Sequence, residues 1–206
     1  DMKRFTCILG SAILAAALSS HTALAENQDR GQETYQTAEE GYGKTDQEIY
    51  GRGSYVIGVD MPAGEYAVFT EDTSENHAFS SCTFTLYKND RDEKKIGTFR
   101  FQHHGLITLY NGQHLILSRG YAVPADQADI SAGTTGMYKA GRDMEPGTYR
   151  LTPLTSDGAH YALYNDVRYY YDYMDDYQTF FEPVTVTLEE GQYIELMDVS
   201  SVEKID

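Results

Sequence analysis

The sequence contains few cysteines, and this shortage limits the covalent chemistry of the chain. Only Cys7 and Cys82 are present among 206 residues, and Cys7 lies in a segment that we expect to be removed. The remaining chain therefore cannot form an internal disulfide and has no Cys-x-x-Cys redox pair. Cys82 alternates with Phe84 and Leu86, which predicts a small buried residue in a strand, with a reactive thiol as the alternative.

Basic residues are also scarce, because acidic residues outnumber them two to one, 32 against 16. The formal net charge is -16, and residues 1–25 contribute +1, so the rest of the chain carries -17. Such a surface repels phosphate backbones and anionic lipid headgroups. We therefore expect neither a nucleic acid nor a membrane surface as a partner, whereas cations and basic proteins are compatible with the charge.

A long apolar stretch occurs once, near the N-terminus. Lys3 and Arg4 precede an apolar run from Cys7 to Leu18, and Ala23-Leu24-Ala25 follows as a small-x-small site. This order is typical of a secretory signal peptide over residues 1–25, and the run is too short to cross a bilayer. We therefore expect no membrane span and a mature chain that is secreted, extracellular or in the cell envelope.

No stretch shows a sustained helical period. Residues 26–52 are polar and punctuated by glycine, which predicts a flexible leader. From residue 53 onward, short apolar runs follow period two and are bounded by Asn, Asp, Gly or charged residues, as in an antiparallel sandwich or small barrel. Asn111-Gly112 between two of these runs predicts a two-residue hairpin.

One motif occurs twice in the chain. Gly53 to Tyr66 reads Gly-Ser-Tyr-Val-Ile-Gly-Val-Asp-Met-Pro-Ala-Gly-Glu-Tyr, and Gly136 to Tyr149 reads Gly-Met-Tyr-Lys-Ala-Gly-Arg-Asp-Met-Glu-Pro-Gly-Thr-Tyr. Seven of these fourteen positions are identical without a gap. We interpret the repetition as an internal duplication, with homologous repeats over residues 53–124 and 136–206 and a linker over residues 125–135.

The duplication predicts an all-β fold made of two tandem homologous antiparallel β-sandwich repeats, jelly-roll-like in form. A repeat of roughly seventy residues is close to the lower size limit for an independent core without disulfides. We therefore expect the two repeats to pack against each other and to share buried surface.

The motif reads as a strand, a turn and a second strand. Its glycines can adopt the positive φ that turns require, and its aspartates can hydrogen-bond the backbone two residues on. An active-site role for the two aspartates is the alternative, but no base, nucleophile or ligand set accompanies both copies. We assign a structural role in the turn to Gly58, Asp60, Gly64, Gly141, Asp143 and Gly147.

The segment from Tyr161 to Phe181 is unusually rich in tyrosine and acid. Tyrosines beside carboxylates can stack on sugar rings or form an adhesive patch for protein. The alternative is a strand pair whose tyrosines alternate between core and solvent. The candidate ligand-binding residues are Tyr164, Tyr169, Tyr171, Tyr173 and Tyr177.

Signals for a metal or a reaction are weak. Asp172, Asp175 and Asp176 could gather oxygen ligands for calcium, although their spacing lacks the pattern of an EF-hand loop; no other cofactor is expected. The adjacent His103 and His104 would point to opposite faces of a strand. The sequence has no Gly-x-Ser-x-Gly elbow, and no pair of carboxylates stands out as a glycosidase site.

The doubled Gly-x-Tyr-x-x-Gly-x-Asp-Met-x-x-Gly-x-Tyr motif resembles a repeat of uncharacterised secreted proteins and lipoproteins of bacteria, often Gram-positive. The Gly53 to Tyr66 copy is close to the family's form, whereas the second copy departs from it at Lys139-Ala140 and Glu145-Pro146. Leu188 to Leu196 resembles the family's closing hairpin. The resemblance implies an all-β module with no assigned activity, and it assigns no catalytic residue.

Together these patterns predict a non-enzymatic binding or adhesion module for extracellular carbohydrate or protein, with Tyr164 to Tyr177 as the contact surface. Two alternatives stay open. One is an extracellular hydrolase that acts on polysaccharide through two carboxylates about 5 to 10 Å apart. The other is a structural spacer without a ligand.

Overall fold

The computed structural model describes residues 48–71, 81–168 and 173–206. The predicted signal peptide and most of the predicted leader lie outside the described residues. The described residues belong to one unit, Asp46–Asp206, and form fourteen strands and no α-helix. The strands make four antiparallel sheets, so the predicted all-β class is confirmed.

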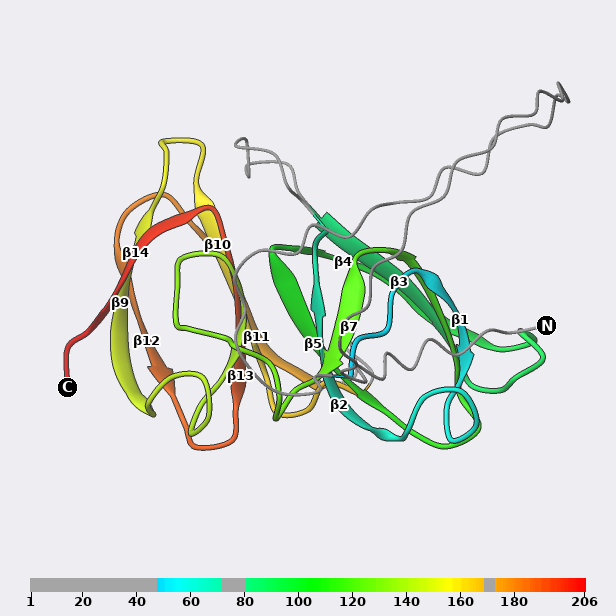
Figure 1. The fold of residues 1–206 in the computed structure, drawn as a ribbon. Helices are drawn as coiled ribbons and strands as arrows, with labels where there is room; N and C mark the ends of the chain where they lie inside the picture. The colour runs from blue at the N-terminus through cyan, green and yellow to red at the C-terminus, as the bar shows by residue number, and fades with distance from the viewer. Residues whose placement is uncertain (1–47, 72–80, 169–172) are drawn as a thin grey trace, which may run out of the picture. The chain divides into compact units, whose positions relative to one another are not determined.

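The first seven strands form two sheets (Figure 1), and we call this part of the chain the first half. A four-stranded sheet has the order β1-β6-β3-β4, and a three-stranded sheet has the order β5-β2-β7. Apolar residues alternate with polar ones along several of these strands, so one face of each sheet can be buried. The strands are β1 (Gly53–Val56), β2 (Gly64–Phe69), β3 (Ser81–Tyr87), β4 (Lys95–Gln102), β5 (His104–Leu109), β6 (His114–Arg119) and β7 (Tyr121–Pro124).

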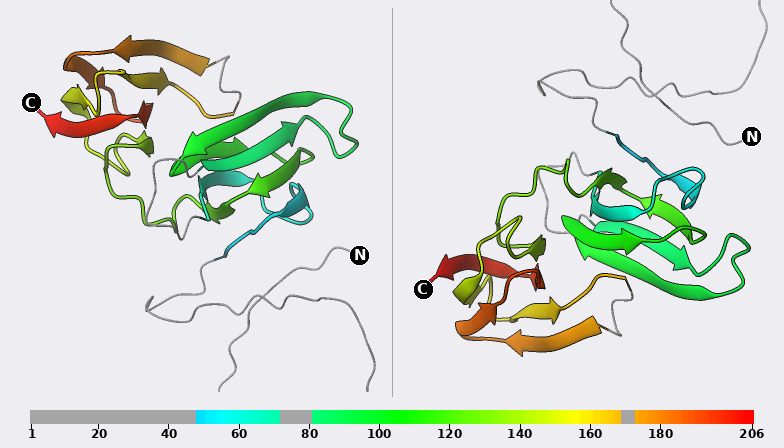
Figure 2. Two further views of the ribbon diagram at one scale, coloured as in Figure 1. Left: turned by 90° about the horizontal axis from the view of Figure 1, so that it is seen from above. Right: turned by 90° about the horizontal axis from the view of Figure 1, so that it is seen from below.

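The remaining seven strands form the second half, whose two sheets can be followed in the views of Figure 2. Their orders are β8-β13-β10-β11 and β12-β9-β14. Each strand thus has a counterpart seven places earlier in the chain. The strands are β8 (Gly136–Lys139), β9 (Gly147–Pro153), β10 (Ala159–Tyr164), β11 (Met174–Phe180), β12 (Val184–Leu188), β13 (Tyr193–Met197) and β14 (Val199–Lys204).

The pairing registers of the two halves also agree. Gly53 lies opposite Leu117 where β1 pairs with β6, and Gly136 lies opposite Leu196 where β8 pairs with β13. Both pairs join the start of the motif to the same position of the later strand. Each half has seven described strands, one fewer than an eight-stranded jelly roll. The equal order and register support the interpretation of the halves as products of a duplication.

The turn at Asn111-Gly112 does not close a hairpin, and that prediction is wrong. Strand β5 before the turn pairs with β2, whereas β6 after it pairs with β1 and β3 of the other sheet. Gly112 has a φ of 83°, and its amide donates to the carbonyl of Ile57 at 2.8 Å. This hydrogen bond ties the turn to the motif, so the chain crosses between sheets instead of turning back.

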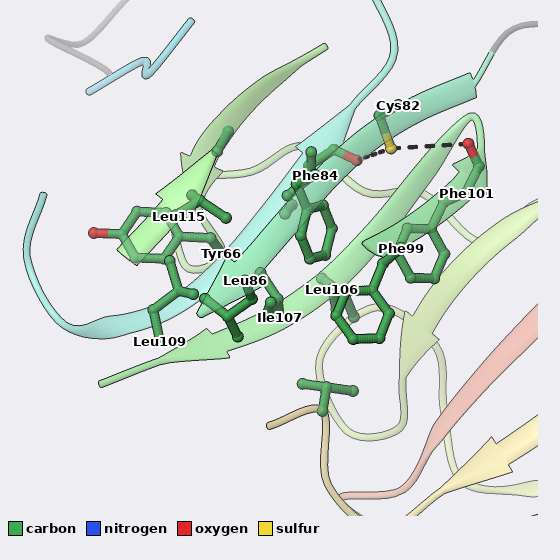
Figure 3. Packing of buried hydrophobic residues seen from close by; sticks show 14 of the residues in the cluster. Tyr66, Cys82, Phe84, Leu86, Phe99, Phe101, Leu106, Ile107, Leu109 and Leu115 are labelled. Atoms are coloured by element: carbon green, nitrogen blue, oxygen red, sulfur yellow. Dashed lines mark hydrogen bonds between the residues drawn. The ribbon is translucent and has the colours of Figure 1, made fainter. Parts of the chain in front are cut away.

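The core of the first half lies between its two sheets (Figure 3). Cys82, Phe84 and Leu86 on β3 are all buried, as their alternation predicts. The Cys82 thiol donates to the carbonyl of Val68 at 3.2 Å, and burial raises the pKa of this thiol to about 12. The thiol is therefore protonated and enclosed at neutral pH, which argues against the alternative of a reactive cysteine.

The outer face of the three-stranded sheet in the first half packs against the four-stranded sheet of the second half. Met137 on β8 and Tyr193 on β13 belong to the same buried cluster as Leu106 on β5. Their chain neighbours Tyr138 and Ile194 belong instead to the core of the second half, because successive side chains of a strand point to opposite faces. The two halves therefore share buried surface, as expected for units of this size.

Candidate functional site

The two motif copies form matching turns. Asp60 Oδ2 accepts a hydrogen bond from the amide of Val56 at 2.9 Å, and Asp143 Oδ2 accepts one from the amide of Lys139 at 2.8 Å. Each carboxylate thus bonds the backbone four residues earlier, and not two residues later as we expected. Asp143 is also paired with Arg142, whose Nε lies 2.7 Å from Asp143 Oδ1. These contacts are those of residues that hold a turn.

The glycines of the turns divide into two kinds. Gly58 and Gly141 have φ values of 90° and 85°, and Gly147 has a φ of 145°, so these three positions favour glycine. Gly64 begins strand β2 without a positive φ, which corrects our expectation for that residue. The amide of Gly58 donates to the carbonyl of Met61 at 2.7 Å, which closes the turn.

The tyrosine segment does not present all its predicted contact residues to solvent. Tyr164 is only 5% exposed, and its hydroxyl donates to Glu195 Oε2 at 2.9 Å. It lies in the buried cluster shared by the two halves, and burial raises the pKa of Glu195. The interpretation of Tyr164 as a contact residue is therefore corrected, because its ring and its hydroxyl are already used inside the protein.

The other candidate tyrosines differ in exposure. Tyr177 on β11 is 50% exposed, and its ring stacks on His160 with centroids 5.9 Å apart. Tyr173 is partly buried, and its ring lies under the Arg168 guanidinium at 5.1 Å. The two remaining candidates, Tyr169 and Tyr171, lie outside the described residues.

The candidate calcium ligands are not gathered into a site among the described residues. No group of three or more His, Cys, Asp or Glu side chains there could hold a metal ion. Asp176 Oδ2 accepts a hydrogen bond from the Tyr161 hydroxyl at 2.7 Å. Asp175 falls at a register shift of β11, opposite the step from Leu163 to Tyr164. Asp172 lies outside the described residues.

A pocket of about 390 Å³ lies where the first half, the linker and the start of the second half meet. The first half contributes the end of β2 with Phe69, the β4–β5 corner with His103 and His104, and Tyr121 at the start of β7. The β8 strand contributes Tyr138. The pocket thus depends on segments that come together only when the halves pack.

Aromatic rings form a continuous wall of this pocket. Phe69 stacks on Tyr121, with centroids 5.5 Å apart and 24° between the planes, and it lies 5.6 Å from the His104 ring. The His104 ring in turn meets Tyr138 edge to face at 5.1 Å. Such packing holds the rings in fixed positions, because offset and edge-to-face pairs are favourable arrangements of aromatic side chains.

His104 is the buried residue that joins Phe69 to Tyr138 in this aromatic wall. Its Nε2 lies 2.7 Å from the carbonyl of Met137, so Nε2 carries the proton and donates it. Burial lowers the pKa of His104 to about 4, which leaves the ring neutral at physiological pH. His103 next to it has a φ of 60° and is exposed. A single left-handed residue therefore separates β4 from β5 and turns the two imidazoles to different environments.

The linker supplies the polar side of the pocket. Ile130 is the apolar exception, and it packs against the buried clusters of both halves. The hydroxyl of Tyr138 donates to the carbonyl of Thr135 at 2.9 Å, which fixes the linker against the ring. The polar side chains that the linker contributes are Asp129, Ser131, Thr134 and Thr135, and the first half adds Thr70 directly after β2.

Sequence reasoning missed this pocket. The sequence predicts a linker over residues 125–135 and opposite orientations for the adjacent His103 and His104, and neither prediction indicates a ligand site. Phe69 and Tyr138, which face each other across His104, are 69 positions apart by residue number. Only adjacency of two histidines at a strand boundary marks the place in the sequence, and that signal does not identify a ligand.

No protein-family model, curated protein or solved structure matches the chain. The part of the chain that the structure describes contains no helix with the length and hydrophobicity needed to cross a bilayer.

Proposed function

We propose that the chain is a binding module for a neutral carbohydrate outside the cytoplasm, and that the pocket lined by the two halves and the linker is its ligand site. One observation carries the proposal: a single pocket is lined both by packed aromatic rings and by a linker rich in hydroxyl groups. The apolar face of a sugar ring can lie on such rings. The hydroxyl groups of the sugar can then bond the polar side chains of the same pocket.

The size of the pocket favours a small ligand. Its volume of about 390 Å³ is near the lower end of the range for small-molecule sites, roughly 300 to 1,000 Å³. A monosaccharide or the end of an oligosaccharide chain suits this volume. An internal segment of a long polymer would need an open groove.

The charge of the site favours a neutral sugar over an acidic one. Asp129 lines the pocket, and the formal net charge of the chain is -16. His104 is neutral above its lowered pKa of about 4, so it does not offset these acids. A uronic acid or a sulfated sugar would therefore be repelled, whereas a carboxylate such as Asp129 can accept hydrogen bonds from neutral hydroxyl groups.

A location outside the cytoplasm rests on the sequence alone. It is supported by the order of basic, apolar and small residues in residues 1–25, which is typical of a signal peptide. Carbohydrate at the cell exterior is then the polyhydroxylated material within reach.

The experiment is a glycan array probed with the full chain, followed by calorimetry with the best neutral saccharide. We expect Y121A to lower the affinity at least tenfold, because Tyr121 is part of the aromatic wall. D129N tests the carboxylate, and a three- to tenfold loss is expected. Y177A is the matched control, because Tyr177 is an exposed tyrosine outside the pocket.

The three variants distinguish the pocket from the tyrosine segment. If Y121A loses affinity for the saccharide and Y177A keeps it, the result supports the pocket as the ligand site. If Y177A loses affinity and Y121A keeps it, the ligand binds at β11 and the pocket is rejected. An array without any neutral saccharide hit would reject carbohydrate as the ligand.

A further inference from the structure

Ser54, His114 and Asp92 form a linear hydrogen-bonded chain on the first half. Ser54 Oγ lies 2.5 Å from His114 Nε2. On the other side of the ring, His114 Nδ1 is in contact with Asp92 Oδ1. The three groups thus occur in the order hydroxyl, imidazole and carboxylate, which is the arrangement that activates a serine nucleophile.

The fold explains how these distant residues meet. Strand β1 lies beside β6 with Val56 opposite His114 and Ser54 opposite Ile116. Ser54 and His114 are therefore diagonal neighbours on one face of the sheet. Asp92 lies in the β3–β4 loop with a φ of 56°, which turns its side chain back toward β6.

The imidazole is held in one orientation. Tyr87 on β3 stacks on the His114 ring with centroids 6.0 Å apart, and His114 is only 8% exposed. Because a carboxylate can only accept, Nδ1 carries a proton toward Asp92, and a neutral ring then presents the lone pair of Nε2 to Ser54. Ser54 itself is exposed, so a solvent-borne substrate can reach it.

The described residues of the second half do not repeat this chain of groups, so the fold does not require it. By register, Met137 takes the place of Ser54, and Tyr193 takes the place of His114. Both of these residues are buried against the first half. The corresponding face of the first half therefore has a hydroxyl group and an imidazole where its counterpart has packing residues.

The backbone beside Ser54 offers a donor for an oxyanion. Strand β1 is the edge of its sheet. The amide of Ile57 donates to the carbonyl of Gln113 on the β6 side, whereas the amide of Val56 donates to Asp60. Because amides alternate along a strand, the Ser54 amide points away from β6, as the Val56 amide does. It can stabilise negative charge on an acyl group bonded to its own side chain.

We propose that Ser54 is the nucleophile, His114 the general base and Asp92 the positioning residue of an esterase site for small, unhindered carboxylic esters. Ser54 Oγ bonds to the ester carbonyl carbon, and its proton passes to His114 Nε2. The C–O bond to the alcohol then breaks, and the alcohol leaves with that proton. Water attacks the acyl-serine, gives a proton to His114, and releases a carboxylic acid as Oγ regains the proton.

This proposal is independent of the carbohydrate site, and it departs from the sequence-based expectation of a non-enzymatic module. The sequence contains no Gly-x-Ser-x-Gly elbow that would mark the site. Ser54 lies in a strand, and His114 and Asp92 lie 60 and 38 positions later by residue number. The flanking side chains of Val56 and Ile116 are partly buried and offer a short apolar surface, which favours short acyl groups.

The test uses the full chain with p-nitrophenyl acetate and with a fluorophosphonate that forms a stable bond to activated serines. We expect hydrolysis above the uncatalysed rate and a fluorophosphonate adduct on Ser54 by peptide mass spectrometry. S54A removes both. S118A is the matched control, because Ser118 is an exposed serine on β6 whose hydroxyl donates to the carbonyl of Thr83.

The positioning role of Asp92 has its own readout. D92N is expected to lower kcat at least tenfold with less than a twofold change in KM, and D92E is expected to recover part of kcat. Absence of an adduct on Ser54 in the wild-type chain would overturn the proposal, as would equal activity in S54A and S118A. Equal kcat in D92N and wild type would remove Asp92 from the site.

Discussion

Glu65 on β2 accepts a hydrogen bond from the hydroxyl of Tyr193 on β13, 128 residues later in the chain. The same carboxylate contacts Arg142 Nη1 and lies 3.2 Å from Lys139 Nζ. Lys139 Nζ also lies 5.0 Å from the centroid of the Tyr193 ring. One acid of the first half thus contacts two cations and a phenol of the second half across the shared interface.

The variant E65Q tests how much this contact contributes to stability. Glutamine keeps the shape of the side chain but removes the charge that offsets two cations. We expect the free energy of unfolding to fall by about 2 kcal/mol, because hydrogen bonds to charged groups contribute roughly 1.5 to 3 kcal/mol. Urea unfolding followed by circular dichroism measures the change. E182Q is the control, since Glu182 is exposed, and an equal effect in both variants would contradict the role of Glu65.

The sequence predicts those parts of the fold that depend on local alternation. Cys82, Phe84 and Leu86 could be placed inward because a strand has a period of two residues. The doubled motif could predict that the halves resemble each other, because the copies that start at Gly53 and Gly136 agree at seven of fourteen positions. These inferences need only neighbours in the chain.

Features that depend on which strands share a sheet could not be predicted in this way. Asn111-Gly112 has the composition of a hairpin turn, yet the flanking strands belong to different sheets. The exposure of Tyr164 depends on the packing of the halves, which no local pattern records. Ser54, Asp92 and His114 likewise meet through strand order and one loop, so no spacing in the sequence brings them together.

The close approach of Gly136 to His104 predicts that the junction tolerates no side chain there. Gly136 has a φ of 122°, and an added Cβ would lie 2.4 Å from His104 Cε1. Because the ring is buried and hydrogen-bonded, it cannot move aside cheaply. We expect G136A to lower the free energy of unfolding by about 3 kcal/mol or more.

G191A is the matched control for that variant. Gly191 also has a positive φ, 81°, but an added Cβ would meet nothing within 4 Å. G191A should therefore lower the free energy of unfolding only through backbone strain, by about 1 to 2 kcal/mol. Chemical denaturation of both variants measures the difference. If G191A proved as destabilising as G136A, contact with His104 would not be the cause.

His104 gives the fold a predictable dependence on pH. Its pKa in the folded chain is lowered to about 4 by burial, below the value of about 6.5 for an unfolded histidine. Between these values the unfolded chain binds the extra proton and the folded chain does not. Stability therefore falls as the pH drops from about 6.5 to 4, by about 1.4 kcal/mol per pH unit and about 3 kcal/mol in total; above pH 6.5 this contribution is fully present.

The variant H104Q isolates this contribution from that of other titrating groups. Its side-chain amide can donate to the Met137 carbonyl as His104 Nε2 does, but it does not titrate. Unfolding free energies at pH 7 and pH 4 should differ by about 3 kcal/mol less in H104Q than in the wild type. H160Q is the control at the partly buried His160, whose Nδ1 bonds Thr179 and Tyr177. An unchanged pH dependence in H104Q would show that His104 is not the residue that links protonation to unfolding.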